Sequence, residues 1–349
     1  MKIKQWIVSL MLLLACAALV GIYDYDQFLN SQLNIATDKP LRIDVKSGRS
    51  ITSIANELAA NNVIDRPRYL AWSARISGQD KHIQAGEYVV EKGVTPNQLL
   101  NKLVAGKVQQ HSFTIIEGWN VSQILQAIKQ NKDLEHLIGE LPASQLMKKL
   151  GQSDVLHAEG WLFPDTYYFV RGESDIKVLL RAYKAMQKHL NAEWEKRSKG
   201  LPYKTPYEAL IMASIIEKET GQGGERKQIS GVFVRRLRKG MKLQTDPTVI
   251  YGIGDKYDGN IRRRDLRTDT PYNTYTRYGL PPTPIAMPGL AAIHAALHPA
   301  DGNSLYFVAK GDGTHVFSNT LKQHNEAVIK YQLKGRRKPF SSSTDSKSK

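Results

Sequence analysis

Residues 205–221 read TPYEALIMASIIEKETG and carry the signals of a well-bounded helix. Thr205 and Glu208 have the spacing of a capping box, and Pro206 suits the first helical position. Gly221 suits the position just beyond the end. We therefore expect a helix of about four turns here.

The two glutamates near the end of this helix should face different ways. At about 100° per residue, Glu217 continues the stripe formed by Leu210, Ala213 and Ser214, whereas Glu219 is turned about 200° away. Apolar surroundings and the negative end of the helix dipole both disfavour a carboxylate, so both should raise the pKa of Glu217. Such an acid suits protonation of a glycosidic oxygen. The alternative is a solvated helix end, because glutamate is rarely buried without a partner.

The first residues predict a membrane anchor. Trp6 to Tyr23 is an apolar run without a charge, preceded by Lys2 and Lys4. Its length spans a bilayer core of about 30 Å, and the lysines favour a cytoplasmic N-terminus. We expect a single-pass protein of the cytoplasmic (inner) membrane whose remaining chain lies outside the cytoplasm. A cleaved signal peptide is the alternative, although its apolar core is usually shorter.

Charge and cysteine usage narrow the class of protein. The chain has 49 Lys and Arg against 33 Asp and Glu, a net charge of +16, which favours an anionic partner. Outside the cytoplasm that partner would be lipid headgroups or a cell-wall polymer, and we expect no nucleic acid. Cys16 is the only cysteine, either a small residue of the span or a loose match to a lipoprotein processing site. The exported part therefore depends on packed cores instead of disulfides.

A short motif occurs twice. Residues 45–51, with Ile54 and Leu58, return as residues 115–121, with Ile124 and Ile128, and Gly48 corresponds to Gly118 in the second copy. Each copy predicts a strand that ends at the glycine and a helix with apolar residues at i, i+3 and i+7.

We predict an α+β fold in five segments. The first unit of the exported part resembles a LysM-like module, although a plain α+β spacer would give the same weak pattern. The expected segments are a cytoplasmic tail and transmembrane helix (1–23), a polar tether (24–40), the LysM-like module (41–108), a mixed α+β catalytic region (109–333, core about 201–333) and a disordered basic tail (334–349).

Residues 158–167, AEGWLFPDTY, combine aromatic side chains with a proline. This pattern is typical of a strand packed on the core, and the alternative is a wall on which sugars stack.

Four segments together resemble one enzyme family. ASIIEKET (213–220), LQTDPTVIYG (243–252), YNTY (272–275) and GLPPTPI (279–285) occur in this order in the YceG-like (MltG-type) endolytic murein transglycosylases. The resemblance runs from the anchor to about Tyr331, although the family more often has Tyr where Trp161 stands. It implies that Glu217 is the catalytic residue.

The resemblance also implies the reaction. Glu217 would protonate the oxygen between N-acetylmuramic acid and N-acetylglucosamine in a nascent peptidoglycan strand. As a carboxylate it would then take the proton of the muramic C6 hydroxyl, which closes onto C1. The product is a 1,6-anhydro end, formed without water or a cofactor, and cutting would limit strand elongation. The family further suggests contact with peptidoglycan synthases in the membrane.

Two other functions remain open. A muramidase would need a second carboxylate about 5–9.5 Å away, and Asp246 is the candidate unless it only forms an Asx turn before Pro247. The third reading is an inert wall-binding protein. Gln244, Asn273 and Tyr275 have side chains suited to sugar hydroxyls and are candidate binding residues.

We expect no metal site. His294 and His298 are one helical turn apart, but no third ligand stands at a motif spacing from them.

Overall fold

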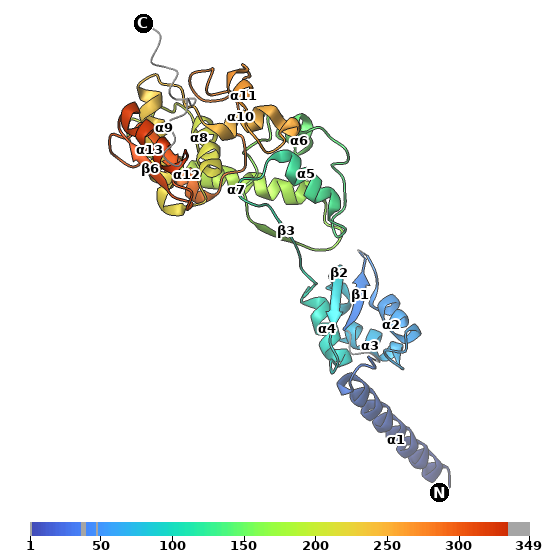
Figure 1. The fold of residues 1–349 in the computed structure, drawn as a ribbon. Coiled ribbons are helices and arrows are strands. Elements are labelled where there is room, and N and C mark those ends of the chain that lie inside the picture. Colours follow the sequence, from blue (N-terminus) through green and yellow to red (C-terminus); the bar gives the residue numbers. More distant parts are fainter. Residues whose placement is uncertain (1, 36–39, 47, 334–349) are drawn as a thin grey trace. The chain divides into compact units, whose positions relative to one another are not determined.

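The computed structural model describes residues 2–35, 40–46 and 48–333 and has a mixed α+β fold, as predicted (Figure 1). It divides into two compact units, one formed by residues 1–111 and 168–172 and the other by the rest of the chain. The predicted basic tail lies outside the described residues.

The first unit places helices between and after two paired strands. β1 and β2 are antiparallel, with Leu41 opposite Val90 and Val45 opposite Gly86. The elements are α1 (Lys2–Asn30), β1 (Leu41–Val45), α2 (Ile51–Ala60), α3 (Pro67–Ile76), β2 (Gly86–Val90) and α4 (Pro96–Val104).

Helix α1 has a free apolar surface. Trp6 is 77% exposed and Val20 is 67% exposed. Residues Gln5–Asn30 form the one helix in the described part of the chain that is long and apolar enough to cross a bilayer. An N-terminal signal sequence has the same property.

The segment after the apolar run differs from the polar tether that we expected. α1 continues to Asn30, and Phe28, Leu33 and Ile35 are buried in the core of the first unit. These apolar residues are spaced too irregularly to stand out in the sequence. Their burial joins the end of the helix directly to the folded module.

The second unit is mainly helical. Besides β1 and β2, the described residues form two more sheets of two strands each, β3 with β4 and β5 with β6. After α4 the chain continues through β3 (His111–Thr114), α5 (Val121–Gln130), α6 (Leu146–Lys149), β4 (Thr166–Phe169), α7 (Asp175–Glu195), α8 (Pro206–Glu219), α9 (Arg226–Arg238), α10 (Asp246–Ile253), α11 (Arg263–Arg267), α12 (Leu290–Leu297), β5 (Tyr306–Ala309), β6 (His315–Ser318) and α13 (Leu321–Tyr331).

Helix α8 is the predicted helix, and it lies at the centre of the second unit. The Thr205 side chain accepts a hydrogen bond from the Glu208 N–H at 3.2 Å, and Pro206 opens the helix. All residues from Ala209 to Ile216 are buried, because α7, α9, α10 and α12 pack around them. A helix enclosed in this way can place a side chain from its last turn in a dry environment.

Both copies of the internal repeat form a strand followed by a helix, as predicted, but the strands end at Val45 and Thr114, before the glycines. α2 and α5 begin 70 residues apart, after Ser50 and Asn120, whose side chains both cap the helix N-terminus. Gly48 and Gly118 have φ of 78° and 77°, a conformation that glycine adopts without strain.

Most of the aromatic stretch packs in the core, as interpreted from its composition. Leu162, Phe163 and Tyr167 are buried. Trp161 is half-buried and stacks on Tyr207 of α8, with ring centroids 5.8 Å apart and planes 8° from parallel.

Candidate active site

Glu217 lies in the last turn of α8, where its side chain is 6% exposed. One carboxylate oxygen, Oε2, accepts the Gly289 N–H at 2.9 Å. The other, Oε1, lies 3.2 Å from Nη2 of Arg226, the first residue of α9. The carboxyl group is therefore nearly enclosed but has a donor for each oxygen.

The predicted stripe of α8 faces the segment before α12. Ser214 accepts the Ile285 N–H at 3.0 Å, and one turn later Glu217 accepts the Gly289 N–H. The side chain of Leu210 lies on the same stripe, 3.4 Å from the place that a Cβ on Gly160 would take. Residues of this stripe therefore contact both the aromatic stretch and the loop that leads into α12.

Opposing influences set the acidity of Glu217. Burial is the largest and raises the pKa of this carboxyl above its ordinary value. The Gly289 N–H and the Arg226 guanidinium lower the pKa, whereas the negative charge of Glu117 raises it. The result is a raised pKa, as the helical stripe predicted, but three residues that the stripe did not identify contribute to it.

Glu117 comes from the turn of the second repeat copy. Its Oε2 is 3.9 Å from the same Arg226 Nη2 that contacts Glu217, and its side chain is 50% exposed. The turn is fixed beside α8, because Lys218 donates to the Gly118 carbonyl at 3.2 Å. The sequence signal for Glu117 was its place directly before the positive-φ glycine of the repeat.

Backbone bonds connect that turn to the segment before α12. Gly118 N–H donates to the Met287 carbonyl at 2.8 Å, and Met287 N–H donates to the Trp119 carbonyl at 2.7 Å. The turn, the end of α8, the start of α9 and the start of α12 thus converge on one carboxyl group. Such convergence from four segments fixes the position of a reacting group.

Glu219 has different neighbours, in agreement with its place on another face of α8. It accepts a hydrogen bond from the Thr245 hydroxyl. The pKa of Glu219 is raised to about 7, chiefly by burial. The Thr245 hydroxyl lowers this pKa, the negative charge of Asp246 raises it and Arg236 lowers it. α8 therefore ends in two carboxyl groups with raised pKa values in separate clusters.

Three of the predicted binding residues gather around the Glu219 cluster. Tyr275 donates its hydroxyl to Asp246 Oδ1 at 2.6 Å. Gln244 has φ of 53° and accepts a hydrogen bond from Arg236 at 3.1 Å through Oε1. Asp246 is the first residue of α10, so Pro247 continues a helix at this place.

The fourth predicted binding residue, Asn273, has its side chain inside a loop. It is 1% exposed, and its amide nitrogen donates to the carbonyls of Asp265, Leu266 and Thr268 at 3.1, 3.3 and 2.7 Å. With its donor hydrogens used in this way, Asn273 shapes the loop that carries Tyr275.

The sequence as a whole matches one protein family. A family model described as YceG-like covers residues 43–330. The chain belongs to the YceG-like family. It is 34% identical over 329 residues to an endolytic murein transglycosylase of Bacillus subtilis (strain 168), a match that covers 89% of this chain and 90% of that protein.

Two further comparisons agree with the YceG-like assignment. An endolytic murein transglycosylase of Streptococcus pneumoniae (strain D39) is 26% identical, and the match covers 94% of this chain but 65% of that longer protein. A 2.6 Å crystal structure of a protein from Listeria monocytogenes, described as a putative YceG-like protein, superimposes with a TM-score of 0.52 at 29% identity. It matches 83% of this chain and 99% of that one.

This YceG-like chain holds another buried carboxyl group that the sequence did not single out. Glu159, in the aromatic stretch, accepts the Val121 N–H at 3.2 Å and the Tyr251 hydroxyl at 2.9 Å. Burial raises the pKa of Glu159 to about 7. Since Val121 begins α5 and Tyr251 lies in α10, Glu159 holds these two helices together.

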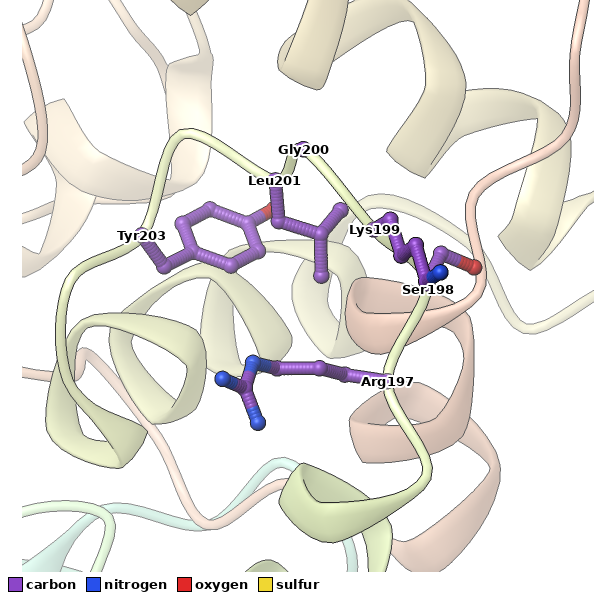
Figure 2. A pocket seen from close by; sticks show the side chains of 6 residues that line it. All are labelled: Arg197, Ser198, Lys199, Gly200, Leu201 and Tyr203. Carbon is purple, nitrogen blue, oxygen red and sulfur yellow. The ribbon is translucent and has the colours of Figure 1, made fainter.

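Residues of the loop between α7 and α8 line a pocket of about 420 Å³ (Figure 2). The residues that line it are Arg197, Ser198, Lys199, Gly200, Leu201 and Tyr203. The buried Tyr203 hydroxyl has no hydrogen-bond partner within the described residues. The loop is held to α9 by Arg238, which donates to the Gly200 carbonyl at 2.8 Å.

Proposed function

We propose that this chain is an endolytic murein transglycosylase that cuts the glycan strands of peptidoglycan. The observation that carries the proposal is the enclosed Glu217 carboxyl group with its raised pKa, at the position that the family resemblance gives to the catalytic acid. The names of the curated relatives support the same activity.

Glu217 has the surroundings that a residue acting twice requires. Burial favours the protonated acid that donates to the glycosidic oxygen between the muramic and glucosamine sugars. Once the proton has left, the Gly289 N–H and Arg226 stabilise the carboxylate. This carboxylate then accepts the proton of the muramic C6 hydroxyl as it attacks C1, and the strand ends in a 1,6-anhydro ring.

The membrane and wall associations belong to the same proposal. The exposed apolar surface of α1 supports a single-pass anchor in the cytoplasmic membrane, with Lys2 and Lys4 inside and the enzyme outside. The paired β1 and β2 with α2 and α3 between them support a LysM-like module. An anchored enzyme would act on strands as the membrane synthases release them, and we propose those synthases as partners.

Analysis of the products tests the reaction directly. Cleavage by the C6 hydroxyl leaves muramic ends lighter by one water than reducing ends, and reaction in ¹⁸O-labelled water should add no label. Mass spectrometry distinguishes the two kinds of end. Fragments of many lengths at early times would support cutting within strands, whereas disaccharide alone would indicate cutting from the ends.

A muramidase is the second candidate, and Glu117 is the observation in its favour. Carboxylate oxygens of Glu117 and Glu217 lie 3.9 and 3.2 Å from the same atom, Arg226 Nη2. The two carboxyl groups are therefore close together, as hydrolysis with two carboxylates requires. The muramidase would be established if the wild-type products carried labelled reducing ends and if Glu117→Gln had no activity. Unlabelled ends, with activity retained in Glu117→Gln, would exclude it. Asp246→Asn is the matched comparison in the other cluster.

A further inference from the structure

Two histidines and a glutamate meet on the surface between α7 and α12. Nδ1 of His294 is 2.7 Å from Oε2 of Glu193, and Nε2 of His298 is 3.7 Å from the same oxygen. The two imidazole rings stack with centroids 4.3 Å apart. Glu193 is the third ligand that sequence spacing did not give, because it precedes His294 by 101 residues.

The three side chains have the composition of a zinc site. Two histidines and one carboxylate are a known ligand set for Zn²⁺, which leaves a fourth position for water or another group. Bonds of about 2.0–2.1 Å to a tetrahedral ion place ligand atoms roughly 3.3–3.4 Å apart. The distances of 2.7 and 3.7 Å from the Glu193 oxygen lie on either side of that value, and the ligand atoms of the three residues all lie within 4.8 Å of one another.

The position in the fold also favours a cation. His298 directly follows α12, and its N–H donates to the His294 carbonyl at 2.8 Å, so both histidines lie at the negative end of the helix. The side chains are 43% exposed at His294, 23% at His298 and 17% at Glu193, which leaves an entry path. Lys227 is near enough to act electrostatically on His298, and its positive charge opposes a bound cation.

We propose that Glu193, His294 and His298 bind one Zn²⁺ ion, or a divalent transition metal of similar preference. The ion would join the end of α7 to the last turn of α12. Since α12 begins directly after Gly289, whose N–H holds Glu217, a fixed α12 would also support the active site from its far end. The site is separate from the residues proposed for catalysis and needs no part in the reaction.

The test uses the tag-free full-length protein in detergent, stripped of metal with a chelator. Calorimetric titration with ZnCl₂ should give one ion per chain, Co²⁺ should give a visible d–d spectrum, and Zn²⁺ should raise the melting temperature. His294→Gln, His298→Gln and Glu193→Gln should each weaken binding by at least about tenfold. His82→Gln, at an exposed histidine of the first unit, should leave the affinity unchanged.

A gain in affinity gives an independent test that does not depend on the folding of those variants. Lys227→Gln removes the opposing charge and should tighten Zn²⁺ binding roughly two- to fivefold. The proposal is overturned if the wild-type protein binds no Zn²⁺, or if the His294→Gln, His298→Gln double variant, folded by circular dichroism, binds it as tightly as the wild type. An unchanged affinity in Lys227→Gln would equally place the ion elsewhere.

Discussion

At the scale of single residues, the acidity of Glu217 depends on a balance between Arg226 and Glu117. Arg226→Gln removes a cation that favours the carboxylate, so the pKa of Glu217 should rise and the alkaline limb of kcat/KM should move to higher pH. Glu117→Gln removes a negative charge, so the limb should move to lower pH. Arg226→Lys keeps the charge and should shift the limb less than Arg226→Gln. Shifts of both Gln variants in one direction would contradict the proposed balance.

The two carboxyl groups at the end of α8 should contribute very differently to the reaction. Glu217→Gln keeps the shape but removes the proton, so activity should fall by at least about 10²–10⁴-fold. Glu219→Gln resembles the protonated form and can still accept the Thr245 hydroxyl, so it should cost far less. Release of glycan fragments measures both. If Glu219→Gln were inactive and Glu217→Gln remained active, the catalytic residue would be Glu219 and not Glu217.

At the scale of elements, the active site depends on how the aromatic stretch packs against α8 and the loop before α12. Gly160 has φ of 82°, and an added Cβ would stand 2.5 Å from Cβ and Cγ of Pro284. Gly160→Ala should therefore cost about 1–2 kcal/mol for the backbone and roughly another 1–3 kcal/mol for overpacking. The free energy of unfolding in urea measures the sum.

Gly139→Ala is the matched control for this packing. Gly139 also has a positive φ, of 67°, but nothing lies within 4 Å of an added Cβ. It should show the backbone cost of about 1–2 kcal/mol alone. Equal losses of unfolding free energy in the two variants would mean that Pro284 moves aside, so that its contact with the added Cβ costs little.

At the scale of the whole molecule, the anchor should be separable from the enzyme. The full-length protein should stay with membranes after a high-salt wash, and a reporter that works only outside the cytoplasm should be active when fused after Tyr331. A version that starts at Asp24 should be soluble and still cut glycan, because it retains the core residues Phe28 and Leu33. Release of the full-length protein into the soluble fraction would instead indicate a cleaved signal.

A shorter version tests the boundary that the structure revealed. A chain that starts at Leu41 lacks Phe28, Leu33 and Ile35, each buried in the first unit. Buried side chains of this size contribute about 1.5–3 kcal/mol each, so this version should unfold at clearly lower temperature than the one that starts at Asp24. Equal melting temperatures would restore the tether interpretation.

Local sequence determined several features of this protein by itself. The cap at Thr205, the stripe that ends in Glu217 and the two repeat copies depend on residues three or four positions apart, and these fix how a helix begins and which way its side chains point. The apolar run of α1 is equally local. These features sufficed to predict the central helix, the raised pKa of Glu217 and the α+β character of the chain.

Only the tertiary structure decided what surrounds those elements. The charge of Glu117 acts on Glu217 from 100 residues earlier in the chain, and the Gly289 N–H bonds to Glu217 from 72 residues later. Glu193 pairs with His294 across 101 residues. Helical periodicity carries no information about such pairs, because it describes directions within one element and leaves the docking of elements to packing. Packing between elements also buries Ala209 to Ile216 of α8 and places Phe28 in the core of the first unit. It brings Asp246 within hydrogen-bond distance of Tyr275.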